Sequence, residues 1–154
     1  KGDAYFLRAW FHWSLLKRYG GLVGDQVMGV PVVKKPLELE EAFDLGRQTY
    51  METVSSIVQD CDSALKYVPE EYTGNDLVTG IPYYGSPTQS IVRSFIGIVY
   101  AFAASPAYNT ENDPALWDSA AVRLSEALLL IDGELNTNAL PAKNFHDPEN
   151  PDVI

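Results

Sequence analysis

Two arginines occupy matching positions in two segments that are otherwise mostly apolar. Arg8 lies in residues 6–11 (FLRAWF), and Arg93 lies in residues 91–96 (IVRSFI). Such cations could clamp an anionic ligand, or each could pair with a carboxylate of a neighbouring helix, such as Asp60 or Glu126. Because a charge withdrawn from water must be paired, the sequence favours a structural role for both arginines.

Histidine is the other side chain that could carry chemistry. His12 follows Arg8 by one helical turn, and the only other histidine is His146. A catalytic histidine needs an orienting carboxylate and a nucleophile, and no such set stands out. No H-E-x-x-H pattern supports a metal site either. We therefore expect no enzymatic activity, no cofactor and no metal ion.

Two loops hold further candidates. Asn109, Glu111 and Asp113 alternate as in a calcium loop, but proline follows at position 114, where such a loop needs glycine, so we expect Asp113 to be a helix N-cap. Tyr83 and Tyr84, in a glycine-flanked loop, could stack on a sugar ring or pack on helix ends. Packing is the favoured interpretation, which leaves them as weak ligand-binding candidates.

The amino-acid composition excludes some classes of function. The 154 residues carry a net charge of −10 and are 46% apolar, as in a soluble globular domain. Binding nucleic acid needs clustered Lys and Arg, so the charge argues against it. The single cysteine, Cys61, excludes an internal disulfide.

Four segments have helical patterns. The first spans about residues 3–19, before two glycines. The second begins at Thr49, where Glu52 completes a capping box, and is closed by Pro69. The third is predicted to begin with a capping box of Ser86 and Gln89. The fourth is predicted to begin at Asp113 and to end before the glycine at 133.

The faces of these helices alternate in character. The first and third are apolar on most sides and are expected to be enclosed by other helices. The second and fourth are amphipathic. Their predicted buried stripes are Tyr50, Val54, Ile57, Cys61, Leu65 and Val68 in the second, and Trp117, Ala120, Ala121, Leu124, Ala127, Leu128 and Ile131 in the fourth. Leu129 and Leu130 fall outside the stripe, which suggests a contact with another surface.

This order repeats, so we predict an all-α fold of two tetratricopeptide-like helix pairs, with four main helices and long loops. The connector of residues 20–46 could hold a short extended stretch at Val30-Pro31-Val32-Val33.

Several segments resemble the SusD/RagB family. Residues 2–12 (GDAYFLRAWFH) are similar to that family's GEARFLRAFYHF helix, and residues 19–21 with 29–33 are similar to its YGGVPLV, interrupted by residues 22–28. Residues 103–109 (AASPAYN) resemble its YAASPLYN. Further matches are Arg47, Thr49, Glu52, Ile57, Asp60, Ala64 and Val68-Pro69 in the second helix, and Trp117, Ala120-Ala121 and Ile131-Asp132-Gly133 in the fourth.

The resemblance implies a helical scaffold over residues 1–135, with residues 136–154 forming a linker to further polypeptide. It implies a non-enzymatic, surface-exposed outer-membrane lipoprotein that binds an oligosaccharide or similar nutrient and works with a SusC-type TonB-dependent transporter. Arg8, Arg93 and Trp117 would be structural residues of that scaffold. The alternative is a tetratricopeptide-type adaptor that binds another protein.

Overall fold

Five helices and one small hairpin make up the computed structural model, which describes residues 1–72 and 85–130. The helices are α1 (Gly2–Tyr19), α2 (Leu39–Phe43), α3 (Tyr50–Leu65), α4 (Gln89–Ala103) and α5 (Ala115–Leu130). The hairpin pairs β1 (Gly21–Val23) with β2 (Gln26–Met28). The predicted all-α class with four main helices is confirmed.

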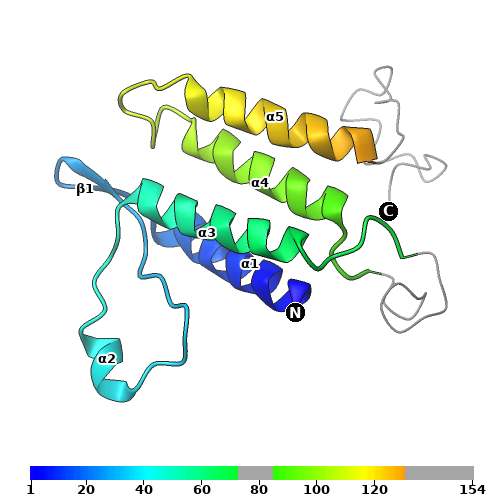
Figure 1. The fold of residues 1–154 in the computed structure, drawn as a ribbon. Coiled ribbons are helices and arrows are strands. Elements are labelled where there is room, and N and C mark those ends of the chain that lie inside the picture. The colour runs from blue at the N-terminus through cyan, green and yellow to red at the C-terminus, as the bar shows by residue number, and fades with distance from the viewer. Residues whose placement is uncertain (73–84, 131–154) are drawn as a thin grey trace, which may run out of the picture.

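The four long helices pack in series (Figure 1). Helix α1 contacts α3, α3 contacts α4, and α4 contacts α5. In Figure 1, α3, α4 and α5 lie one above another, with α1 behind α3 and the connector with α2 extending to one side. Two antiparallel helix pairs, α1–α3 and α4–α5, are thereby stacked through α3 and α4, as the repeat in the sequence predicts.

Aromatic side chains join the two helix pairs. Trp13 of α1 has its ring 6.3 Å from that of Phe95 and 5.0 Å from that of Phe102, both on α4 and both edge-on. Phe6 meets Phe95 in the same edge-to-face geometry at 5.4 Å. Such contacts add to the free energy of burying the rings, so a few large side chains hold α1 against α4.

Helix α3 begins as the sequence predicts. The Glu52 backbone N–H donates to Thr49 Oγ1 (3.2 Å), and the Thr49 N–H donates to Glu52 Oε2 (2.9 Å). The predicted stripe is confirmed, because Tyr50, Val54, Ile57, Cys61 and Val68 are at most 5% exposed and Leu65 packs against this core.

The predicted start of the third helix is wrong. Helix α4 begins three residues after Ser86, with Thr88 as its N-cap and no capping hydrogen bond from the Thr88 side chain. Gln89 instead binds residues that follow α3. Its backbone N–H donates to the Pro69 carbonyl oxygen (2.9 Å), and its side-chain amide donates to the Val68 carbonyl oxygen (3.4 Å). These tertiary contacts therefore replace the capping box that the sequence predicted between Ser86 and Gln89.

The start of α5 agrees with the sequence. Asp113 Oδ1 accepts a hydrogen bond from the Ala115 N–H at 3.0 Å, which is the N-cap interaction expected before Pro114.

The connector between α1 and α3 holds elements that the sequence analysis missed. Residues 22–28, the insertion in the family pattern, form most of the β1–β2 hairpin, and Gly24 adopts a φ of +65° in its turn. The Val30–Val33 stretch belongs to no strand, in agreement with the expectation that Pro31 keeps it out of a central strand. Among the described residues, one isolated β-bridge, between Met28 and Thr49, links the hairpin to the start of α3.

Two expectations about burial are wrong. Helix α1 is not enclosed, since Leu7 and Phe11 are 50% and 64% exposed, and α4 likewise exposes Ile98. In α5 only Ala120 and Ala127 are buried, whereas Trp117, Ala121 and Leu124 of the predicted stripe are exposed. Within the described residues, the backbone of α1 runs closest to α3 and that of α5 closest to α4, while aromatic side chains of α1 also reach α4.

Candidate functional site

Asp60 is the centre of the strongest polar cluster in the described chain. Its carboxylate is 5% exposed and accepts hydrogen bonds from Arg8 Nε at 2.7 Å, Arg8 Nη2 at 2.6 Å and Lys34 Nζ at 2.9 Å. The two bonds from Arg8 have the bidentate fork geometry that arginine forms with carboxylates. The cluster therefore joins α1, α3 and the connector at one point.

Arg8 and Lys34 also fasten the connector to helices α1 and α3. Arg8 Nη1 donates to the Lys34 carbonyl oxygen (2.8 Å), and Lys34 Nζ donates to the carbonyl oxygen of Ser56 on α3 (3.1 Å). Burial by itself raises the pKa of Asp60, but the hydrogen bonds from Arg8 and Lys34 outweigh it and hold that pKa below its ordinary value. Asp60 is thus a carboxylate whose charge is satisfied within the fold.

His12 is a buried neutral histidine next to this cluster. Its Nε2 accepts the backbone N–H of Val33 at 3.0 Å, so its Nδ1 carries the proton and donates to the Arg8 carbonyl oxygen at 2.9 Å. Burial lowers the pKa of His12, and the charges of Lys34 and Arg8 lower it further. Both ring nitrogens are occupied by the backbone, so the ring has no free nitrogen for acid–base chemistry or for a metal.

The second helix pair carries a looser ion-pair cluster. Arg93 Nη1 donates to Glu126 Oε2 at 2.6 Å, and Arg123 spans Glu126 and Asp62, with 3.4 Å to each. Arg93 Nε is buried without a hydrogen-bond partner among the described residues. The structure therefore contains both predicted pairs, Arg8 with Asp60 and Arg93 with Glu126, but only the first is bidentate.

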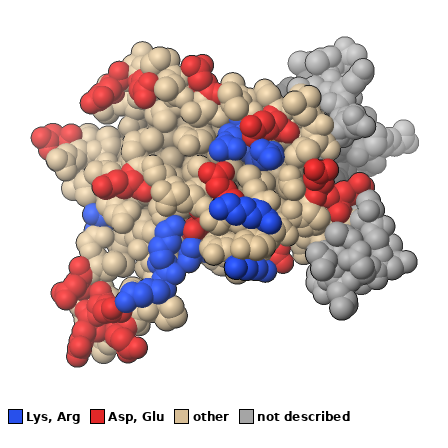
Figure 2. Space-filling model, viewed as in Figure 1, with Lys and Arg blue, Asp and Glu red and all other residues tan. Residues whose placement is uncertain are grey.

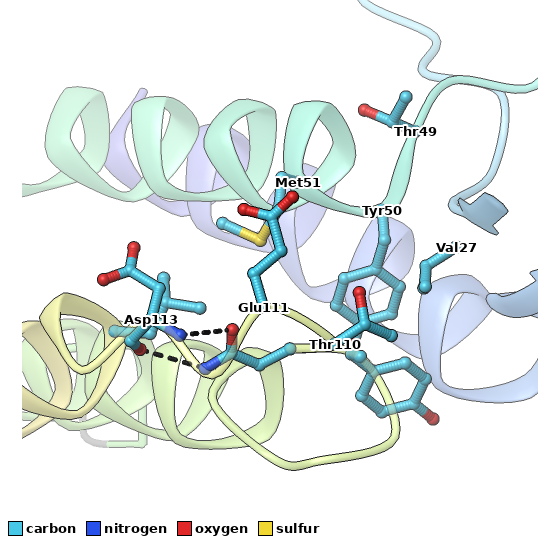
Figure 3. Close-up of a pocket in the computed structure, with 10 residues that line it drawn as sticks. Val27, Thr49, Tyr50, Met51, Thr110, Glu111 and Asp113 are labelled. Carbon is cyan, nitrogen blue, oxygen red and sulfur yellow. Dashed lines mark hydrogen bonds between the residues drawn. The ribbon is translucent and has the colours of Figure 1, made fainter.

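A hollow of about 320 Å³ opens between the start of α3 and the loop that follows α4 (Figure 3). Its apolar part contains the stacked rings of Tyr50 and Tyr108, whose centroids are 4.2 Å apart. Figure 3 shows the Glu111 side chain extending from the loop toward Met51 of α3. The hollow combines an aromatic floor with an acidic, solvent-facing rim.

The calcium-like alternation of Asn109, Glu111 and Asp113 has a structural explanation. The Asn109 side-chain amide donates to the Asp113 carbonyl oxygen (2.9 Å), and its oxygen accepts the Asp113 N–H (2.8 Å), as the dashed lines in Figure 3 show. The nitrogen and the oxygen of the Asn109 side chain thereby both form hydrogen bonds that close the loop. Among residues 1–72 and 85–130, no group of three or more acidic, His or Cys side chains is arranged to hold a metal ion.

A second hollow, of about 550 Å³, also has Met51 in its lining. It is lined mainly by hydroxyl and amide side chains of α3 and by Lys34 of the connector. Because Thr49 and Met51 line both hollows, the two adjoin across the first turn of α3.

Trp117, another residue singled out in the sequence, lines neither of these hollows. Tyr83 and Tyr84 lie outside the described residues. The Trp117 ring is 51% exposed on α5. Lys34 is the member of the Asp60 cluster that sequence reasoning missed, since nothing in its neighbourhood in the sequence shows that the connector folds back onto α3.

The surface over these elements carries charged side chains of both signs (Figure 2). Figure 2 shows basic side chains next to acidic ones over the helices, and a gathering of acidic side chains over α2, where Glu40 and Glu41 lie in the first turn. No described helix has both the length and the apolar character needed to cross a membrane.

Comparisons with known proteins agree with this fold. The family model SusD-like_3, described as "Starch-binding associating with outer membrane", matches residues 1–100 of the 154. A solved structure of selenomethionine BT4246 superposes with a TM-score of 0.62 at 20% sequence identity, covering 85% of this chain. The chain spans 23% of the length of that protein. No curated protein matches the chain significantly.

Proposed function

This chain belongs to the SusD-like family, and on that premise we propose that it is the helical scaffold of a non-enzymatic outer-membrane lipoprotein that binds oligosaccharides. The observation that carries the proposal is the family match over residues 1–100, which includes α1, α3 and the Asp60 cluster. The family is described by starch binding and by outer-membrane association, not by a reaction. The protein would act at the cell surface with a SusC-type TonB-dependent transporter.

The contacts of the polar residues support a scaffold role. Arg8 directs three of its N–H groups to Asp60 and to the connector, and Arg93 directs its charge to Glu126. A buried or half-buried pair of this kind fixes how helices meet and leaves little charge for a ligand. We therefore assign Arg8 and Arg93 to bracing the two helix pairs. Trp117 is proposed as a third structural residue, with its ring half exposed.

The domain boundaries remain part of the proposal. Residues 1–135 would form the scaffold and residues 136–154 a linker, and both the boundary and the linker lie outside the described residues. Tyr83 and Tyr84 stay weak candidates for contact with a sugar.

The alternative, a tetratricopeptide-type adaptor, fits less well. A peptide-binding groove of that kind needs polar side chains along its first and third helices. In the described chain the open sides of α1 and α4 instead present Leu7, Phe11 and Ile98. An apolar surface of this kind favours a covered scaffold.

Co-purification tests the proposed partnership. The complete polypeptide, as its gene encodes it, would be affinity-tagged, expressed in its own host and extracted from outer membranes with mild detergent. We expect a TonB-dependent transporter to co-elute in a near-equal amount, and an unrelated tagged lipoprotein to bring down none. Recovery of the tagged protein without a transporter, from membranes that contain one, would count against the partnership.

A further inference from the structure

The loop that carries α2 is closed at its base by contacts of its own. The Gly29 N–H donates to the Gln48 carbonyl oxygen (2.8 Å), and Met28 forms a β-bridge with Thr49. We call residues 31–47, which lie between these contacts, the connector loop. Because both of its ends are tied together at the base, the connector loop can leave the helices without separating the elements that flank it.

No residue of the connector loop is buried, and none belongs to the hydrophobic core that the described helices form. Leu39 and Phe43 of α2 are 74% and 81% exposed. Figure 1 shows α2 on a loop that extends away from the four long helices. A segment with so few buried apolar contacts opens more easily than the core, so the polar contacts of the connector loop matter most for its position.

These polar contacts meet at His12. The Val33 N–H donates to His12 Nε2 at 3.0 Å, and His12 Nδ1 donates to the Arg8 carbonyl oxygen at 2.9 Å. Beside them, Arg8 Nη1 donates to the Lys34 carbonyl oxygen at 2.8 Å, and Lys34 Nζ donates to Asp60 at 2.9 Å. If the imidazole gained a second proton, its Nε2–H would face the Val33 N–H, and two donors cannot bond to each other.

The charges that face His12 come from each element around it: Arg8 from α1, Lys34 from the connector loop and Asp60 from α3. Burial lowers the pKa of His12 most, and the charges of Lys34 and Arg8 lower it further, while the Arg8 carbonyl oxygen and Asp60 raise it. Lifting the connector loop would admit water to the ring and take Lys34 away from it. Both changes raise the pKa of His12, so a proton binds the released state more tightly than the fastened state.

We propose that His12 is an acid-sensitive latch: protonation of its ring releases the connector loop from α1 and α3, while the base of the loop and the four long helices stay folded. The second hollow would change with it, because Val32 and Lys34 of the connector loop line that hollow together with side chains of α3. Acid would therefore remove one of its walls. This regulation goes beyond the proposed function and does not depend on it.

Hydrogen–deuterium exchange tests the latch in the complete polypeptide, as its gene encodes it, at pH 7.5 and 5.5. Labelling times are lengthened at pH 5.5 to compensate for slower intrinsic exchange, and single amides are resolved by fragmentation in the mass spectrometer. We expect the protection factor of the Val33 amide to fall by up to about tenfold at pH 5.5, the limit for one proton taken up near pH 6.5. The Gly29 amide at the base and the amides of α3 should keep their protection.

His12→Gln separates the latch from other effects of acid. This variant cannot take up the proton but retains His146, so its Val33 protection factor should be the same at both pH values. Three results would overturn the proposal. The first is an unchanged Val33 protection factor in the wild type, and the second is an equal fall in the wild type and in His12→Gln. The third is a parallel fall at Val33, Gly29 and α3, because acid would then unfold the helices and not release the connector loop alone.

Discussion

At the residue scale, the Asp60 carboxylate is the point at which three separate segments meet. It receives the Arg8 guanidinium from α1 and the Lys34 ammonium from the connector, and it is itself carried by α3. Its side chain is 5% exposed, whereas those of Arg8 and Lys34 are 30% and 39% exposed. Loss of the carboxylate therefore leaves two half-buried cations without their partner.

Asp60→Asn tests how much this cluster contributes to the stability of the fold. The substitution keeps the shape but removes the charge, and we expect the free energy of unfolding to fall by about 2 kcal/mol, less than for a fully buried pair because both cations reach solvent. Urea denaturation of both proteins measures the difference.

The matched control is Glu41→Gln, which removes the charge from the exposed Lys35–Glu41 pair (2.7 Å). Exposed pairs contribute little, so this variant should unfold like the wild type. Equal stability of Asp60→Asn and Glu41→Gln would show that the cluster does not brace the fold.

His12 gives stability a pH dependence whose sign follows from its surroundings. Burial first, then the charges of Lys34 and Arg8, hold its pKa below the ordinary 6.5, while the Arg8 carbonyl and Asp60 act in the opposite direction. The unfolded chain therefore takes up a proton near pH 6.5, before the folded chain does. Stability is complete above that pH and falls as the pH drops toward the folded pKa.

The corresponding prediction compares wild type with His12→Gln, whose amide oxygen can still accept the Val33 N–H. Between pH 7.5 and 5.5 the wild type should lose stability, by at most about 1.4 kcal/mol per pH unit, and the variant should lose less. Urea denaturation at both pH values measures this. Parallel losses in the two proteins would contradict the assignment of a neutral His12.

The sequence predicted part of the candidate site. Asp60 and Glu126 could be named as possible partners of Arg8 and Arg93, because a charge in an apolar helix needs a partner. The contacts of Lys34 and of the Val33 N–H could not be predicted, because these residues belong to a connector whose path depends on tertiary contacts and not on periodicity.

At the element scale, Gly29 determines how closely the connector passes α3. Its N–H donates to the Gln48 carbonyl (2.8 Å), and an added Cβ would lie 2.0 Å from Thr53 Oγ1 and 2.6 Å from the Thr49 carbonyl oxygen. The Arg47 side chain fixes the same point, donating to the carbonyl oxygens of Gly29 and Tyr19. The close approach is possible only because this residue lacks a side chain.

Gly29→Ala should therefore destabilise the chain by about 1–3 kcal/mol, because the connector must move away from α3. Gly46→Ala, in the same connector but with open space around its Cβ, is the control and should cause no loss. Thermal unfolding of the two variants measures the contrast. A Gly29→Ala protein as stable as Gly46→Ala would mean that the connector does not pack as described.

Local sequence signals predicted the elements with uneven success, and the reasons are physical. The Thr49–Glu52 box formed, with both of its side chains bonded to backbone N–H groups within the first turn of α3. The Ser86–Gln89 box did not form, because Gln89 binds the carbonyls of Val68 and Pro69 instead. The hairpin and α2 were missed because elements of three and five residues carry too little periodicity to be recognised.

At the scale of the whole molecule, the two helix pairs leave several large apolar side chains exposed on α1 and α4. The sequence identified α1 and α4 as apolar on most sides and predicted that other helices enclose them, but in the described chain Leu7, Phe11 and Ile98 are exposed. Periodicity reports that a face is apolar and cannot report what covers it. Under the proposed scaffold role, the described chain would frame a binding site without forming it.

Isothermal titration calorimetry tests that central claim most directly. The complete polypeptide, as its gene encodes it, would first be screened for an oligosaccharide that it binds, and the 154-residue chain would then be titrated with the same sugar under the same conditions. We predict measurable binding by the complete polypeptide and no binding heat from the 154-residue chain. Binding by the 154-residue chain with the affinity of the complete polypeptide would contradict the account, because the site would then lie within these helices.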